Sequence, residues 1–359
     1  MRPSANQWTA LGACLCLLVA PACRATSTTP DDFNRQLEQA DYSKTADNAR
    51  FQESLRQLDA VAASLTPRQR LYLRYLHAWQ TAYSGNMQAA LPALDAVIHD
   101  AQDPALRIRA GVSAVNLLNI ASRNEEAYTR LNRLLDELPS VSDHFARSQA
   151  LSVASQLYTL AGQYDLGLSL ATHLELEAQT DRDRCGSAYL KTLALQKSRS
   201  TDLQPATFTE GIATCTKAGE PLFIANIRDM QARTLFDRAQ ATQAIKILQD
   251  GYAATQATHY APTIADTDAT LALAYEHIGD DEAAQRYALR VVSTMAKARP
   301  TEIVADALGV LFRASKHRGD FAAALDWHEK FAAAQMGYLS DVSARALAYQ
   351  MVHQQVAQK

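Results

Sequence analysis

The sequence contains little glycine, little proline and few aromatic residues. Among its 359 residues are 13 glycines and 11 prolines, and aromatic residues make up 7%. Glycine and proline interrupt helices and aromatic residues favour strands, so this scarcity favours an all-helical chain. The net charge is only −3, so the chain also lacks the broad positive field that neutralises phosphates. Nucleic acid is therefore not an expected partner.

Recognisable catalytic motifs are also missing. The sequence contains no phosphate-binding loop, no nucleophile elbow, no His-Glu-x-x-His pair and no Cys-x-x-Cys pair. His328-Glu329 lacks the second histidine that a zinc-binding helix needs, and the nine histidines are scattered along the chain. We therefore expect no enzymatic activity, no metal site and no cofactor.

A short apolar stretch lies near the N-terminus. Arg2 precedes the largely apolar segment Thr9 to Val19, and Ala20-Pro21-Ala22 has the small-x-small pattern of a cleavage site, which predicts a signal peptide over residues 1–25. The stretch is shorter than the roughly 20 residues of a spanning helix, so no transmembrane span is expected in the mature chain. The alternative is a lipoprotein signal with a lipid anchor at Cys23. Both alternatives predict export, and we expect a periplasmic protein.

One short turn pattern recurs along the chain. A turn residue is followed by polar residues and by a small residue that opens a helix, as in Gly279-Asp280-Asp281-Glu282-Ala283-Ala284. The gap between the third and fourth copies is close to two periods, so a degenerate unit is expected near Ser200, with Pro205 in the first turn of its second helix. The turn residues, spaced 37, 40, 77, 40 and 40 apart, are Gly85, Ser122, Gly162, Ala239, Gly279 and Gly319.

These residues resemble the tetratricopeptide family, whose hairpins have small residues where helices cross, a Gly or Asn turn, and alanine early in the second helix. The clearest matches are Leu271–Tyr275 before Gly279 and Leu157-Tyr158 before Gly162. The resemblance implies an all-α, right-handed superhelical solenoid of about seven helical hairpins whose neighbours share one core. The period of about 40 exceeds the usual 34, so we expect longer helices or loops.

The two ends of the chain are expected to differ from the repeats. Residues 31–65 are predicted to form N-terminal capping helices, residues 66–337 the repeat array, and residues 338–359 a C-terminal helix. On or near one side of that last helix lie Leu339, Val342, Leu347, Met351 and Val356.

The segment Tyr338 to Met351, after an exported repeat array, resembles the periplasmic sensor region of bacterial membrane-bound diguanylate cyclases of the GGDEF type. The chain lacks their Gly-Gly-Asp/Glu-Glu-Phe motif. The resemblance therefore implies a detached regulatory part or a free-standing relative, without cyclase activity.

Cys185 and Cys215 are the two cysteines that certainly remain after removal of the predicted leader. Their midpoint is residue 200, the turn inferred from the repeat spacing. Residues equidistant from the turn of a helical hairpin can lie side by side, and disulfides persist in exported proteins. We expect a disulfide that stabilises the fold by roughly 3 kcal/mol, with two separate buried thiols as the alternative.

Residues 13, 10 and 6 positions before each turn share one face of the first helix of each hairpin. The family resemblance implies that this concave face binds an extended peptide or a helix. Amides can pair with a peptide backbone, arginine with a carboxylate, and aromatic rings with an apolar side chain. The candidate groove residues, with the neighbouring Asn119, are Tyr72, Tyr75, Trp79, Arg109, Asn116, Asn119, Gln149, Gln156, Asn226, Asp229 and Arg233.

Two alternatives remain open for these residues. The aromatic group Tyr72, Tyr75 and Trp79 could pack on the capping helices, and polar residues that face any groove can simply be solvated. The sequence predicts an exported binding module that recognises a protein or peptide for sensing or scaffolding. The alternative is the detached regulatory part of a diguanylate cyclase signalling protein.

Overall fold

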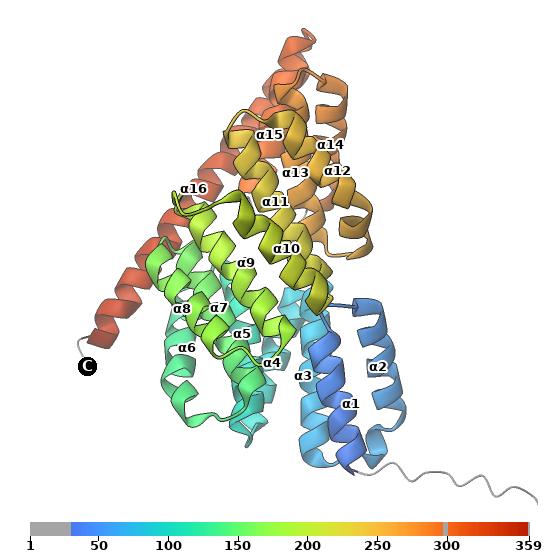
Figure 1. Ribbon diagram of the computed structural model, residues 1–359, viewed down its shortest axis with the longest axis vertical. Coiled ribbons are helices and arrows are strands. Elements are labelled where there is room, and N and C mark those ends of the chain that lie inside the picture. The colour runs from blue at the N-terminus through green and yellow to red at the C-terminus, as the bar shows by residue number, and fades with distance from the viewer. Residues whose placement is uncertain (1–29, 297–300, 358–359) are drawn as a thin grey trace, which may run out of the picture.

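The computed structural model describes residues 30–296 and 301–357, and all regular secondary structure within these ranges is helical (Figure 1). The predicted signal peptide, including Cys23, lies outside the described residues. Within the described part of the chain, no helix combines the length and apolar character that crossing a bilayer requires.

A helical cap precedes a series of helical hairpins. The cap consists of α1 (Pro30–Ser43) and α2 (Asn48–Ala60), followed by the short 3₁₀ helix η1 (Ala62–Ser64). A second 3₁₀ helix, η2 (Leu138–Ser140), follows α6. The hairpins are α3 (Pro67–Tyr83) with α4 (Met87–Asp100), α5 (Pro104–Ile120) with α6 (Asn124–Glu137), α7 (His144–Leu160) with α8 (Tyr164–Leu176), α9 (Asp181–Lys197) with α10 (Pro205–Ala218), α11 (Pro221–Asp237) with α12 (Ala241–Ala257), α13 (Ala261–His277) with α14 (Asp281–Thr294), and α15 (Glu302–His317) with α16 (Phe321–Ala357).

Consecutive helices of this series pack against one another, and the first helices of successive hairpins also touch. The predicted all-α solenoid of tetratricopeptide-like hairpins is therefore confirmed. Buried alanines seven or eight positions before the turns of the first helices permit this close packing, because a small side chain lets two helix backbones approach. Those with no exposed surface include Ala114, Ala154, Ala272 and Ala232.

The turns of the hairpins lie where the recurring pattern predicted them. All six predicted turn residues adopt a left-handed backbone conformation, including the non-glycine residues Ser122 (φ 56°) and Ala239 (φ 60°). The degenerate unit is also present, with Arg199 (φ 53°) as its turn residue, and Pro205 begins its second helix. A left-handed residue ends a helix and satisfies its last carbonyl groups, so the turn pattern marks the helix ends.

Cys185 on α9 and Cys215 on α10 flank this degenerate turn. The structure joins them in a disulfide with a Cα–Cα distance of 4.6 Å, and neither residue has exposed surface. The pairing is the one expected from their equal distance to residue 200.

The last helix differs from the prediction. A separate helix was expected to begin at residue 338, but α16 is continuous from Phe321 to Ala357 and is 37 residues long. The expected boundary is wrong because α16 contains no proline, and its one glycine, Gly337, costs only about 1 kcal/mol relative to alanine. Of the five apolar residues expected on or near one side, Leu339, Val342, Leu347 and Met351 are exposed, and the side chain of Val356 lies outside the described ones.

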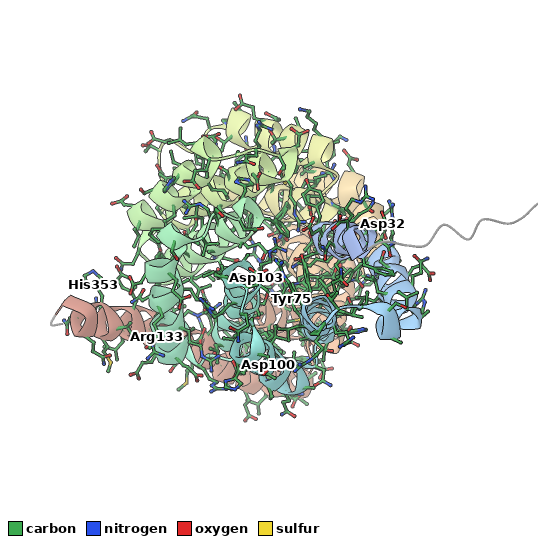
Figure 2. All side chains as sticks on the ribbon, turned by 90° about the horizontal axis from the view of Figure 1, so that it is seen from below. Asp32, Tyr75, Asp100, Asp103, Arg133 and His353 are labelled. Carbon is green, nitrogen blue, oxygen red and sulfur yellow. A yellow bond between two sulfur atoms is a disulfide. The ribbon has the colours of Figure 1, made fainter. Side chains whose placement is uncertain are left out.

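The two halves of α16 contact hairpins that are far apart in the sequence. Its first half packs on α15, and its second half packs on α6 and α7. Figure 1 shows α16 as a long helix along one edge of the molecule. There the ring of Tyr349 packs edge-on against Tyr128 (centroids 5.9 Å apart) and Tyr158 (5.5 Å), and Val352 is buried. In the view from below, Tyr75 lies inside the ring of helices and His353 lies at its far edge (Figure 2).

The cap touches the middle of the array, because the superhelix brings α9 and α11 round to the turn after α1. Arg182 on α9 donates a hydrogen bond to the Thr45 hydroxyl (2.8 Å), which donates to Glu220 (2.9 Å). The ring of Tyr83 at the end of α3 stacks on Tyr260 just before α13, with centroids 5.0 Å apart. The first helices of the hairpins thus surround an interior space.

Candidate ligand-binding cavity

A cavity of about 350 Å³ lies in this interior space. Its wall contains the C-terminal end of α3 with Trp79, the middle of α7 with Ser152, and the N-terminal ends of α11 and α13 with Phe223 and Thr263. The lining positions thus move from the ends of the early first helices to the beginnings of the later ones. The superhelix tilts each hairpin relative to the last, so the cavity crosses the inner face at a slant.

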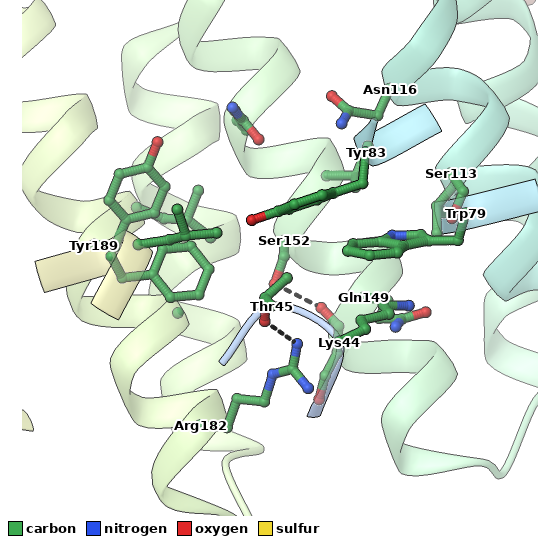
Figure 3. A pocket seen from close by; sticks show the side chains of 18 of the residues that line it. Lys44, Thr45, Trp79, Tyr83, Ser113, Asn116, Gln149, Ser152, Arg182 and Tyr189 are labelled. Atoms are coloured by element: carbon green, nitrogen blue, oxygen red, sulfur yellow. Dashed lines mark hydrogen bonds between the residues drawn. The ribbon is translucent and has the colours of Figure 1, made fainter. Parts of the chain in front are cut away.

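Aromatic rings form two sides of the cavity. Trp79 stacks on Tyr83 with centroids 5.1 Å apart, and Tyr189 contacts Phe223 at 5.0 Å (Figure 3). Figure 3 shows Tyr189 approaching from the side opposite Trp79 and Tyr83. Burial, with a smaller effect of Tyr260, raises the pKa of Tyr83 to about 12, so this phenol is uncharged at neutral pH. These rings can hold an apolar or aromatic group of a ligand.

Amide side chains form the polar part of the wall. Asn116, Gln149 and Gln156 donate and accept no side-chain hydrogen bond within the described residues, and the Oε1 atom of Gln149 is buried without a partner. Asn226 accepts a hydrogen bond from the Thr263 hydroxyl (3.0 Å), which leaves its NH₂ group unengaged. An amide carries both a donor and an acceptor, as a peptide bond does. The cavity therefore offers hydrogen-bonding groups that the protein itself does not use.

The charged groups of the wall, in contrast, all contact protein partners. Lys44 is buried, and its Nζ atom contacts Asp41 and donates a hydrogen bond to the Tyr75 hydroxyl (2.7 Å). Each charged side chain that lines the cavity has an oppositely charged or ionisable partner: Lys44 with Asp41, Arg182 with Glu220, and Asp183 with His144. The arrangement is suited to a ligand recognised by shape and hydrogen bonds more than by charge.

The structure divides the predicted groove residues into two sets. Five of them line the cavity: Trp79, Asn116, Gln149, Gln156 and Asn226. The other six are outside the cavity wall: Tyr72, Tyr75, Arg109, Asn119, Asp229 and Arg233. Asn119 is only 5% exposed, and its Oδ1 atom has no hydrogen-bond partner.

Arg109 is part of a buried network that connects the cap to the first hairpins. Its guanidinium contacts Asp41 on α1 (3.3 Å) and both carboxylate oxygens of Asp143 (2.8 and 3.0 Å), and it donates to the Tyr72 hydroxyl. Burial raises the pKa of Asp41, but the positive charges of Lys44 and Arg109 together lower this pKa by more than burial raises it. The net shift is therefore downward. The expectation that Arg109, Tyr72 and Tyr75 face an open groove is corrected, because all three bind this internal carboxylate network.

Asp229 and Arg233 belong to a second internal cluster, on the C-terminal half of the array. The Arg233 guanidinium contacts Asp229 (3.3 Å), Asp266 (3.2 Å) and Asp306 (3.2 Å), and Asp229 is 3% exposed. Burial and the neighbouring Asp266 raise the pKa of Asp229 to about 7, against the effect of Arg233. The expected groove position of these two residues is likewise corrected, because they connect α11 to α13 and α15.

Several cavity residues were not predicted. Tyr189 lies 10 positions before the turn residue Arg199, which is the same register as the predicted candidates. It was missed because this hairpin lacks the recurring turn pattern from which the face residues were counted. Lys44, Arg182 and Tyr260 have no comparable signal in the sequence, because their place in the wall depends on the superhelix bringing the cap to α9 and α13. Among the described residues, no group of His, Cys, Asp and Glu side chains could hold a metal ion.

Comparison with known proteins identifies the fold. No protein-family model matches the chain, and no curated protein sequence does. The solved structure of a Rap protein complexed with competence and sporulation factor is similar over 92% of this chain and 99% of that chain, with a TM-score of 0.64 and 10% identity. A signal-transduction ATPase with numerous domains and a tetratricopeptide repeat sensor, from Pyrococcus horikoshii, is similar over 85% of this chain and 50% of that chain, with a TM-score of 0.52 and 12% identity.

These similarities show a tetratricopeptide-like fold. Neither neighbour is described as a diguanylate cyclase, so the resemblance of residues 338–351 to the sensors of those enzymes stays a prediction.

Proposed function

We propose that this protein is a binding module without catalytic chemistry, and that its cavity takes an extended segment of a peptide or protein. One observation carries the proposal: Asn116, Gln149 and Gln156 face a cavity between aromatic rings and have no side-chain hydrogen-bond partner among the described residues. The Oε1 atom of Gln149 is buried without a partner, which costs about 1 to 3 kcal/mol, and a bound peptide N–H could donate to it. The similar Rap protein, which is complexed with a factor, supports this function.

We further propose that the chain works in the periplasm as a sensor or scaffold. Support comes from the predicted leader over residues 1–25 and from the disulfide between Cys185 and Cys215, since disulfides persist mainly in oxidising compartments.

The experiment begins with a displayed library of random peptides. Peptides are selected on the wild-type protein and depleted on Ser152→Phe, which places a large ring in the cavity wall; circular dichroism first verifies that this variant is folded. Affinities of the enriched peptides are then measured by calorimetry. We expect peptides that bind the wild-type protein and not Ser152→Phe. Failure to enrich any such peptide would refute the proposal.

The same peptides distinguish a binding role of Gln149 from a packing role. Gln149→Met should weaken binding about 10-fold, the loss of roughly one hydrogen bond, while stabilising the unliganded protein by about 1 kcal/mol or more because a buried unpaired acceptor is removed. Gln243→Met, an exposed position on α12, is the matched control and should change neither quantity. A Gln149→Met protein that binds the peptides with unchanged affinity contradicts the assignment of this amide.

A further inference from the structure

The outward face of α16 carries a row of exposed apolar side chains. Phe321 (71% exposed), Leu325 (62%), Met336 (72%), Leu347 (57%) and Met351 (40%) are all accessible. Their spacings of 4, 11, 11 and 4 residues correspond to about one or three whole helical turns, so these side chains share one face. We call these five residues the α16 stripe.

The α16 stripe lies on the side of the helix that no other described element covers. The opposite side packs on α15 through Ala334 and on α6 and α7 through Ala348 and Val352. From Phe321 to Met351 the stripe extends for about 45 Å at 1.5 Å per residue. Single exposed apolar residues are ordinary, but five on one helix face over this length are typical of an interaction surface.

The stripe is symmetric about Met336. Phe321 and Met351 lie 15 residues on either side of it, and Leu325 and Leu347 lie 11 residues on either side. When two copies of such a helix pair antiparallel about a two-fold axis at Met336, Leu325 of each copy meets Leu347 of the other, and Phe321 meets Met351. An isologous contact requires this kind of self-complementarity, in which one surface serves both subunits.

The residues between the stripe positions favour the same arrangement. In the antiparallel register, exposed Leu339 lies opposite exposed Ala333, so a large side chain meets a small one. Glu329 lies on the same face and comes opposite the hydroxyl of Ser343. A parallel pair in register would instead bring the two Glu329 carboxylates together, and like charges facing each other are unfavourable.

We propose that the α16 stripe is the interface of a homodimer, in which two copies of this chain pair their α16 helices antiparallel about Met336. The stripe is exposed on the surface of the molecule and shares no residue with the cavity. The dimer therefore does not depend on the proposed peptide-binding function.

The first test is the mass in solution, measured by light scattering on a sizing column over a range of concentrations. The wild-type chain should run as a dimer, at twice the mass of its monomer. Met336→Asp places two carboxylates on the axis and should raise the dimer dissociation constant about 30-fold or more, as for other central interface residues. Leu176→Asp is the matched control, because Leu176 is 81% exposed on α8 outside the stripe, and it should leave the dimer intact.

The second test is the orientation, measured by disulfide trapping in a background with Cys14, Cys16 and Cys23 replaced by serine. Mixing Leu325→Cys with Leu347→Cys should give a cross-linked heterodimer. Leu325→Cys alone should not cross-link, since the two copies of residue 325 would lie about 33 Å apart. A disulfide needs Cα atoms within about 7 Å.

Three results would overturn the proposal. One is a wild-type chain that stays monomeric at every concentration, and another is a dimer that Met336→Asp leaves unchanged. The third is self-linking of Leu325→Cys without linking to Leu347→Cys, which would indicate a parallel pair. Circular dichroism of each variant verifies the fold, which exposed positions should preserve.

Discussion

Replacement of Arg109 by alanine tests whether this residue stabilises the fold or contacts a ligand. The side chain is 7% exposed and holds together α1, α3 and the start of α7 through Asp41, Tyr72 and Asp143. Its guanidinium also lies over the Phe145 ring, 4.8 Å from the centroid. The structure therefore predicts a large loss of stability and no direct loss of ligand contact.

The size of this stability loss depends on how deeply each of the two carboxylates paired with Arg109, those of Asp41 and Asp143, is buried. Asp41 has no exposed side-chain surface, and removal of one partner of a buried ion pair typically costs about 3 to 5 kcal/mol. Lys44 remains beside Asp41 in the variant, which favours the lower end of that range. The Asp143 side chain is 37% exposed, so its pair contributes about 1 kcal/mol or less. We expect a total loss of about 3 to 4 kcal/mol.

Urea unfolding followed by far-UV circular dichroism measures this loss. Arg130→Ala is the matched control, because Arg130 also binds two carboxylates, Asp95 and Glu126, but is 29% exposed. That variant should lose about 1 kcal/mol or less. If Arg109→Ala is no less stable than Arg130→Ala, the buried network does not stabilise the fold and the reasoning is refuted.

The pH dependence gives a second readout of the same network. The folded-state pKa of Asp41 lies below its usual value of 3.8, so the stability contributed by its ion pairs is present above that pH and is lost as pH falls through the folded pKa. The stability difference between wild type and Arg109→Ala should therefore be largest near neutral pH and shrink below about pH 4. A difference that grows on acidification would contradict the ionised state of Asp41.

Two further predictions concern other internal contacts. Protein purified from an oxidising compartment should show no reactive thiol at Cys185 or Cys215 under denaturing, non-reducing conditions, and two reactive thiols would exclude the disulfide. Reduction of the disulfide should lower the free energy of unfolding by about 3 kcal/mol. Burial and Asp266 raise the pKa of Asp229 from 3.8 to about 7, so its contribution to stability is present at low pH and is lost as pH rises toward 7. The melting temperature of wild type should thus fall relative to Asp229→Asn between about pH 4 and 8, and parallel curves would refute this.

The hairpins could be predicted from the sequence because their signal is local. A turn residue and a small residue a few positions later specify a helix end and a helix start, so the order of hairpins and the degenerate turn near residue 200 could be predicted from spacing alone. The boundary at residue 338 failed for the same reason. The local sequence of α16 contains no helix breaker that would end the helix at residue 338, and contacts with α6 and α7, far away in the sequence, hold its second half in place.

The cavity could be predicted only in part. Helical periodicity identifies the inner face, which located Gln149 and Gln156, but it treats every hairpin alike. The superhelix instead tilts the cavity across that face, so at the same register Trp79 lines it and Arg233 does not. Charged residues such as Arg109 were the hardest to place, because only the folded structure brings Asp41 to α5.

Attachment of α16 at both ends has a mechanical consequence. When each hairpin contacts only its neighbours, the pitch of the superhelix can change by small rotations spread over many interfaces. Here α16 connects the last hairpin to the second and third hairpins, because it packs on α15 and, through Tyr349, on Tyr128 of α6 and Tyr158 of α7. The array between these hairpins cannot lengthen unless α16 bends or its second half, held there by Tyr349, Ala348 and Val352, leaves α6 and α7.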